Sequence, residues 1–122
     1  LLPMNAVVVP TLDGKEHYLY LMSATTQPNV SVIGRHYRFR FSADGRENLE
    51  TISFSNSCLA LPSAIPNGAK LVAGQVSHLR TNYPQEHHVF ISLSHDLPYY
   101  IGIPKTNAVW KVDDAKIKQV KP

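Results

Sequence analysis

The sequence predicts a single β-dominated domain over residues 1–122, an antiparallel meander of about seven strands that forms a sandwich or a partly open barrel. Short apolar and β-branched runs alternate with turn residues, which is typical of strands joined by tight turns. No window keeps a helical apolar period over several turns, so we expect no long helix. The densest runs lie in residues 86–113, where strands are expected in quick succession.

The first half of the chain predicts two hairpins, each closed by an Asp-Gly turn. Their strands are expected to cover residues 5–9, 15–22, 35–41 and 49–54. The turns are Asp13-Gly14 and Asp44-Gly45. This dipeptide tolerates the positive φ angles that a tight hairpin turn requires. The polar residues 23–31 are expected to form the loop between the two hairpins.

The clearest alternation in the chain lies in residues 35–41. Aromatic and basic side chains take turns there, and a period of two places them on opposite faces of a strand. The side chains expected in the core are those of Tyr37, Phe39 and Phe41. The side chains expected to face water are those of His36, Arg38 and Arg40.

The second half predicts an irregular segment followed by further strands. Residues 55–70 contain Pro62 and Pro66, with room for one helical turn over residues 56–61. The strands expected after this segment cover residues 71–79, 87–95, 99–101, 109–112 and 116–120. Lysines along the last strand are typical of a protected sheet edge.

Composition limits the classes of protein to which the chain can belong. A net charge of +3 over 122 residues, with a pI near 9.1, falls well short of a dedicated nucleic-acid binder, so we expect no nucleic-acid partner. No apolar stretch approaches the ~20 residues that span a bilayer. The single cysteine, Cys58, excludes an internal disulfide and multi-cysteine metal sites, and its apolar neighbours predict a buried thiol.

The six histidines are the candidate metal ligands, and the strand assignment argues against them. A metal site needs three or four ligands that converge on a point about 2 Å away. His87 and His95 on one strand would lie roughly 26 Å apart. If the predicted strands 71–79 and 87–95 form a hairpin, His78 lies opposite His88, with Cβ atoms ~5 Å apart. Because no third ligand is expected to reach this pair, we predict no metal and no cofactor.

Ser94, His95 and Asp96 are the residue types of a serine-hydrolase triad, but their spacing argues against one. Consecutive side chains on a strand point to opposite faces, and triad members normally come from separate segments. The chain also lacks a Gly-x-Ser-x-Gly nucleophile turn. We therefore predict no catalytic residue.

A histidine and aromatic region is the first candidate binding surface. Tyr99 and Trp110 are expected on neighbouring strands, and such a cluster suits an apolar or peptide-like partner when it is exposed. The residues assigned to this surface are His78, His88, Tyr99 and Trp110.

A cationic stripe is the second candidate surface and would bind anions. Its residues are Arg35, Arg38 and Arg40. No exposed aromatic residue is expected beside the stripe, although an oligonucleotide surface would use one for stacking. Glu47 and Glu50 on the returning strand are expected to neutralise part of its charge.

Five short segments of the chain carry a resemblance to known proteins. They are Phe41-Ser42-Ala43-Asp44-Gly45, Ser57-Cys58-Leu59-Ala60-Leu61, Val76-Ser77-His78-Leu79, His88-Val89-Phe90-Ile91-Ser92-Leu93 and Val109-Trp110-Lys111-Val112. With these segments, roughly residues 35–120 resemble a group of small, apparently exported bacterial proteins without assigned function. The resemblance implies a bacterial origin and a location in the cell envelope, and it implies no catalytic residue.

The leading hypothesis is a non-enzymatic binding or inhibitory module, periplasmic or exported, whose partner is unknown, with a protein as the candidate class. The first alternative is a small metal-dependent or acid–base enzyme that uses His78, His88 and His95. The second alternative is an anion or nucleic-acid binder that uses the cationic stripe.

Overall fold

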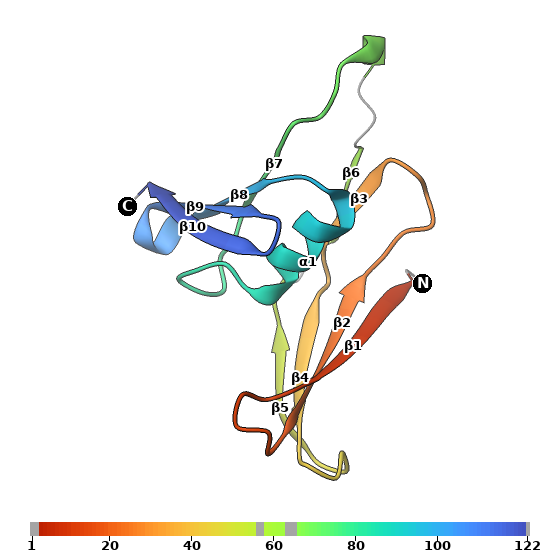
Figure 1. Cartoon of the computed structure of the whole chain (residues 1–122), viewed down its shortest axis with the longest axis vertical. Helices are drawn as coiled ribbons and strands as arrows, with labels where there is room; N and C mark the ends of the chain where they lie inside the picture. Colours follow the sequence, from red (N-terminus) through yellow and green to blue (C-terminus); the bar gives the residue numbers. More distant parts are fainter. Residues whose placement is uncertain (1–2, 56–57, 63–65, 122) are drawn as a thin grey trace. The chain divides into compact units, whose positions relative to one another are not determined.

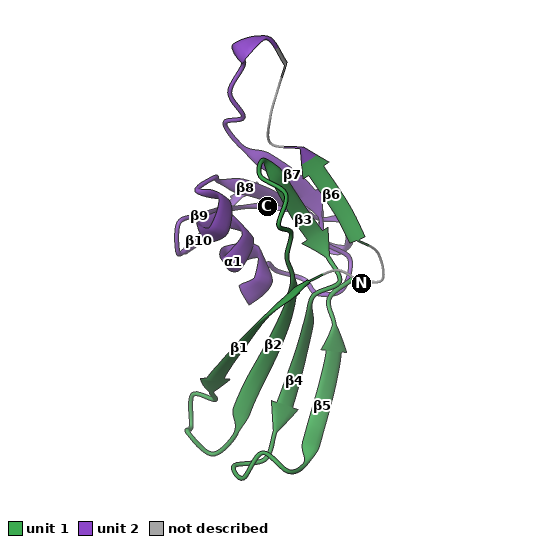
Figure 2. Cartoon of the chain, turned by 90° about the vertical axis from the view of Figure 1, so that its right-hand side faces the viewer, with its two compact units in different colours: residues 1–61 green, residues 62–122 purple. Residues whose placement is uncertain are grey.

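The computed structural model describes residues 3–55, 58–62 and 66–121 (Figure 1). The described residues form ten strands, one α-helix and two short 3₁₀ turns, so the predicted β-dominated fold is confirmed. The chain divides into two compact units, residues 1–61 and 62–122 (Figure 2). The single domain expected from the sequence stays a prediction.

Unit 1 contains a four-stranded antiparallel sheet in the order β1-β2-β4-β5. Its strands are β1 (Met4–Pro10), β2 (His17–Ser23), β4 (Tyr37–Phe41) and β5 (Asn48–Ser53). A separate two-stranded sheet pairs β3 (Val30–Gly34) with β6 (Cys58–Pro62). β3 begins inside the segment that was expected to be a loop. The helical turn expected over residues 56–61 is also wrong from Cys58 onward, where β6 begins, while residues 56 and 57 lie outside the described residues.

The two Asp-Gly turns of unit 1 are confirmed, and they share one hydrogen-bond pattern. In the first turn, the carboxylate of Asp13 accepts hydrogen bonds from the Thr11 hydroxyl and the Lys15 N–H. The equivalent bonds in the second turn are those of Ser42, Asp44 and Arg46. These hydrogen bonds, with that from the hydroxyl as the largest cause, lower the pKa of both aspartates. The six-residue pattern Ser/Thr-x-Asp-Gly-Lys/Arg-Glu is therefore a short repeat with one local structure.

The prediction that His36 faces water is wrong. Its side chain is 1% exposed, and its Nδ1 accepts a hydrogen bond from the Ser23 N–H at 3.2 Å. The physical reason is that the extended backbone conformation is interrupted just before β4, where Gly34 and Arg35 have φ angles of 100° and 51°. β4 therefore begins only at Tyr37, and His36 does not follow the alternation of that strand.

The aromatic face of β4 is half-buried instead of forming a closed core. Tyr37, Phe39 and Phe41 stack along the strand with ring centroids 6.4 and 6.3 Å apart. The opposite face is not fully solvated either, because the Arg38 side chain is 16% exposed and its guanidinium lies 4.8 Å from the centroid of the Tyr18 ring. Cys58 was expected to be buried and is exposed instead, on a strand whose residues are all exposed or half-buried.

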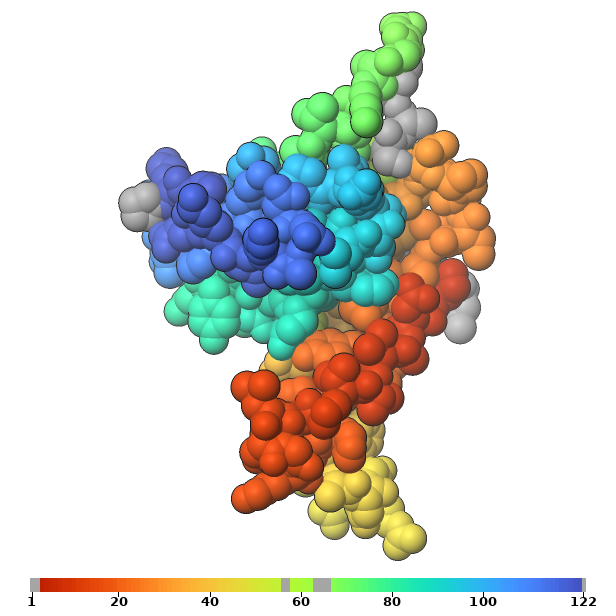
Figure 3. Space-filling view, in the orientation of Figure 1, coloured from red at the N-terminus to blue at the C-terminus, as the bar shows by residue number. Residues whose placement is uncertain are grey.

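Unit 2 contains a four-stranded sheet in the order β10-β9-β8-β7. Its strands are β7 (Gly74–Ser77), β8 (Tyr99–Ile103), β9 (Ala108–Asp113) and β10 (Lys116–Lys121), and its 3₁₀ turns are η1 (Pro66–Gly68) and η2 (Pro104–Thr106). Its buried apolar side chains come mainly from β8 and β9, with Ile101 and Val112 fully covered. All six residues of β10 are exposed, and the dark-blue C-terminal hairpin lies at the surface of its unit (Figure 3).

The strand expected at residues 87–95 is instead the α-helix α1 (Glu86–His95). The buried positions are 87, 88, 91 and 92, which is helical spacing. Three of these four residues are polar (His87, His88 and Ser92), so the helical period is hidden when only apolar residues are counted. The helix also explains why β7 and β8 pair in parallel, because a parallel pair needs a long crossover connection.

No helix among the described residues has the length and apolarity needed to cross a membrane.

Candidate metal centre

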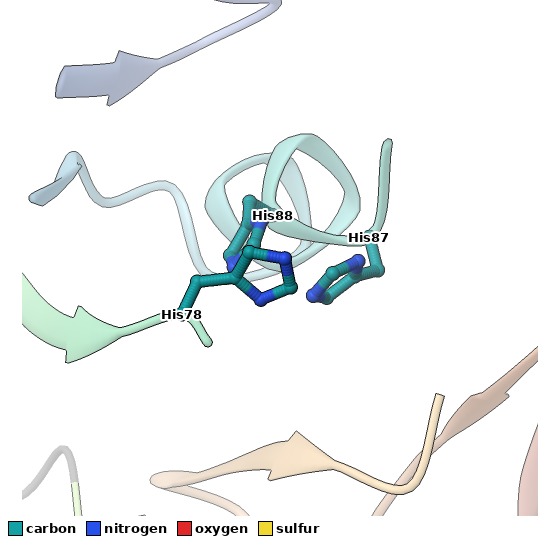
Figure 4. A group of neighbouring side chains, drawn as sticks. All are labelled: His78, His87 and His88. Atoms are coloured by element: carbon teal, nitrogen blue, oxygen red, sulfur yellow. The ribbon is translucent and has the colours of Figure 1, made fainter. Parts of the chain in front are cut away.

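Three histidine side chains meet in unit 2, between the end of β7 and the first turn of α1. His78 follows β7 directly, and His87 and His88 lie next to each other at the start of α1 (Figure 4). The ring centroid of His88 lies 4.8 Å from that of His78 and 3.8 Å from that of His87. All three residues are buried, with exposed fractions of 5%, 4% and 3% in chain order. We call these three residues the histidine cluster.

The backbone on both sides holds the cluster in place. The His78 N–H donates a hydrogen bond to the Gly102 carbonyl at 2.8 Å, which extends the β7–β8 ladder by one residue. Residues 79–85 turn the chain from β7 to α1, and Pro84 is buried within this turn. The first turn of α1 then brings two consecutive side chains to the end of a neighbouring strand, an arrangement that an extended strand would not give.

His78 has a defined ring form. Its Nε2 lies 2.8 Å from the Thr81 hydroxyl oxygen, which donates its own proton to the Tyr83 carbonyl at 2.6 Å. The Thr81 oxygen therefore accepts from His78, so Nε2 carries the ring proton and Nδ1 carries a lone pair. Burial, helped by the positive charge of Lys105, lowers the pKa of His78. The ring is thus neutral at neutral pH, which is the form that binds a metal.

His88 takes part in the N-terminal cap of α1. The backbone N–H of Gln85, the N-cap residue, donates a hydrogen bond to Nδ1 of His88 at 3.0 Å. This contact is the half of a capping box that a Glu or Gln side chain usually makes at the third helical position. Because Nδ1 accepts this bond, the neutral ring of His88 carries its proton on Nε2.

The spacing of the ring nitrogens is close to that of a metal site. One nitrogen from each histidine can be chosen so that all three lie within 4.8 Å of one another. Ligand nitrogens in a tetrahedral zinc site are about 3.4 Å apart, because each lies 2.0–2.1 Å from the ion. Small rotations of the rings would therefore close the site. Among the described residues, no cysteine, aspartate or glutamate joins this group.

The cluster corrects two expectations from the sequence. His78 and His88 do lie together as predicted, but through a helix and not through a hairpin. His87, which was placed on one strand with His95 and was not expected to reach this pair, is the third residue of the group. The reason for expecting no metal site, a missing third ligand, therefore no longer holds. The signal that could have found His87 is the i, i+4 spacing of 87 and 88 with 91 and 92.

The other histidines lie elsewhere. His95 is in the last turn of α1, eight residues beyond His87, which corresponds to about 12 Å along a helix. Burial lowers the pKa of His95. Ser94 and Asp96, its neighbours in the chain, are exposed, and Asp96 ends the helix with a φ angle of 50°. His17 and His36 belong to unit 1.

Tyr99 does not form the exposed aromatic surface that was expected. It is 2% exposed and belongs to the core of unit 2, where its ring covers Gly74. Trp110 is half-buried on β9 and pairs with Ile101 of β8. Its indole Nε1 is buried and has no hydrogen-bond partner within the described part of the chain. Of the two aromatic residues, an apolar partner could therefore contact Trp110 but not Tyr99.

The cationic stripe is largely paired with carboxylates. Arg40 contacts Glu16 at 2.6 Å and Glu50 at 4.0 Å, and Arg38 contacts Glu50 at 3.8 Å. Arg35 is exposed and lies just before β4, where its φ angle of 51° interrupts the extended backbone. Glu50 was expected to neutralise the stripe and does contact it, whereas Glu16 was not foreseen. An anion would have to compete with these ion pairs, and the proposed anion site stays a prediction.

Comparisons with protein-family models, curated proteins and solved structures found no significant match to this chain. The resemblance to exported bacterial proteins stays an expectation.

Proposed function

We propose that this chain is a non-enzymatic binding module whose ligand is a transition-metal ion held by His78, His87 and His88. The observation that carries the proposal is the convergence of three buried imidazole rings, whose nitrogens lie within 4.8 Å of one another. The proposal keeps the binding function expected from the sequence. It replaces the unknown partner with an ion.

The ligand chemistry favours zinc, copper(II) or nickel over magnesium or calcium. Imidazole nitrogen suits the first group of ions, whereas magnesium and calcium prefer oxygen ligands. The start of α1 carries a partial positive charge, which opposes a cation by about 0.3–1 kcal/mol. This cost is small against metal–imidazole bonds, since structural zinc sites in peptides bind with about 10–16 kcal/mol.

A metal-dependent enzyme is the second candidate, and one observation favours it. The group has three histidines and no fourth protein ligand among the described residues. Catalytic zinc sites also have three protein ligands, with water in the fourth position and the pKa of that water lowered to ≈ 7. Hydrolysis of an activated ester by the zinc-loaded protein, lost in His87→Gln, would favour this candidate over simple binding.

An exported or periplasmic location in a bacterium is part of the proposal only through the resemblance of roughly residues 35–120. The metal site does not depend on it. Fractionation of cells that express the full-length protein would test the location separately.

Zinc binding can be tested by thermal unfolding and calorimetric titration of the purified chain. We expect zinc at a hundredfold excess over its Kd to stabilise the folded chain by about 2.7 kcal/mol, because the ion binds the folded state. His78→Gln and His87→Gln should remove most of this effect. His95→Gln is the matched control, because His95 lies on the same helix outside the cluster. A wild-type protein that zinc does not stabilise, or an equal loss in His95→Gln, would contradict the proposal.

A further inference from the structure

We infer that Thr81 and Gln85 are positioning residues for the histidine cluster and that they act on metal binding in opposite directions. The Thr81 hydroxyl holds His78 in the ring form that binds an ion. The backbone N–H of Gln85 holds His88 in a form that must give up a hydrogen bond before it can bind. This inference rests on the proposed function, since it concerns the same site.

The Thr81 hydroxyl is fully used, and this determines the orientation of His78. Its single proton goes to the Tyr83 carbonyl at 2.6 Å. Its oxygen faces Nε2 of His78 at 2.8 Å and accepts a bond from the Gln85 side-chain amide at 3.3 Å. A hydroxyl has one donor and two acceptor positions, so these three contacts complete it. His78 therefore donates from Nε2 and presents Nδ1 to an ion.

Such an outer hydrogen bond is a usual part of a histidine metal site. A metal-binding imidazole normally donates its other N–H to a nearby acceptor, which sets the ring form and raises its basicity as a ligand. Loss of such a partner typically weakens metal binding 10- to 100-fold. Thr81 provides this partner for His78 before any ion is bound.

Gln85 has the opposite effect on His88. A backbone N–H can only donate, so Nδ1 of His88 must supply the lone pair for the 3.0 Å contact. The proton of the neutral ring is then on Nε2. Binding through Nδ1 uses the same lone pair, and binding through Nε2 moves the proton to Nδ1. In both cases the Gln85–His88 hydrogen bond is lost, so an ion competes with the N-terminal cap of α1.

Nuclear magnetic resonance of the wild-type chain tests both halves without a mutation. Ring ¹⁵N spectra of the metal-free protein should place the proton of both His78 and His88 on Nε2. When zinc is added, His78 should keep that proton and bind through Nδ1. The backbone amide of Gln85 should shift and exchange with solvent several-fold faster, because its acceptor is gone. An unchanged Gln85 amide in a zinc-saturated protein would overturn the inference.

Two variants separate positioning from simple packing. Thr81→Val keeps the shape of the side chain and removes the acceptor, so we expect zinc affinity to fall roughly 10- to 100-fold. Thr81→Ser restores the hydroxyl and should bring the affinity back to within about threefold of wild type. A Thr81→Val protein that binds zinc like wild type, or a Thr81→Ser protein as weak as Thr81→Val, would overturn the inference.

The two proposals fail in different ways. If zinc does not bind the wild-type chain, the proposed function itself is wrong. If zinc binds wild type and depends on all three histidines, yet Thr81→Val and the Gln85 amide show no effect, only the inference about positioning is wrong.

Discussion

His36 is a buried histidine outside the histidine cluster, and its environment makes it sensitive to acid. Its Nδ1 accepts a hydrogen bond from the Ser23 N–H, and its carbonyl accepts one from the Phe54 N–H at 2.9 Å. Burial lowers its pKa from 6.5 to about 4. At neutral pH, unit 1 therefore holds a neutral imidazole whose protonation would place a charge away from water.

Mild acid should destabilise unit 1 through this group. Below its ordinary pKa of 6.5 the unfolded chain takes up a proton at His36, whereas the folded chain does so only near 4. The free energy of unfolding should therefore fall as the pH drops through this window, by about 3 kcal/mol in full. Above the ordinary pKa, no stability is lost through this group.

Urea unfolding followed by circular dichroism between about pH 7 and 4 measures this loss. His36→Gln does not titrate and can still accept the Ser23 hydrogen bond, so the part of the pH dependence that comes from His36 should disappear in this variant, while the smaller parts from His78 and His95 remain. His17→Gln, in β2 of the same unit, should keep it. An equal pH dependence in wild type and His36→Gln would show that His36 does not control acid stability.

At the scale of elements, the turns that depend on local hydrogen bonds could be predicted from the sequence more easily than the helix, which depends on packing. The turns at Asp13-Gly14 and Asp44-Gly45 follow from a side chain that bonds its own neighbours, so the sequence is enough to predict them. α1 depends instead on what its buried face meets in the folded chain. Two residues of that face, His87 and His88, are polar, so a count of apolar residues in the sequence does not predict that the face is buried.

The packing of β7 against β8 depends on a glycine whose role is clear only in three dimensions. A Cβ atom added at Gly74 would overlap the ring of Tyr99, which is itself buried. Gly74→Ala should therefore lower the free energy of unfolding of unit 2 by roughly 1–3 kcal/mol, as overpacking in a core usually does.

Gly102→Ala on the neighbouring strand is the matched control, since the nearest atoms to its added Cβ lie 3.8 Å away. We expect this variant to change the stability by about 0.5 kcal/mol or less, measured by urea unfolding with Trp110 fluorescence as the probe. Equal losses in the two variants would show that the Gly74–Tyr99 contact has no special role.

At the scale of the whole molecule, the fold class could be predicted, and of the histidine cluster only the pair of His78 and His88 could be. Alternating apolar runs predict strands in both units, and most of those strands are present. The histidine cluster joins His78 to residues nine and ten positions later, and their approach depends on a crossover helix between parallel strands. Because residues 87–95 were predicted as a strand and not as a helix, His87 was not recognised as the third ligand. All three residues of the histidine cluster lie in unit 2.

X-ray absorption of the zinc-loaded chain at one equivalent of zinc tests the central claim most directly, because it counts the imidazole rings around the ion. We expect three imidazoles at about 2.0–2.1 Å with one further light ligand, and a loss of one imidazole in His87→Gln. A shell of oxygen ligands, or fewer than two imidazoles in wild type, would contradict a metal centre built from His78, His87 and His88.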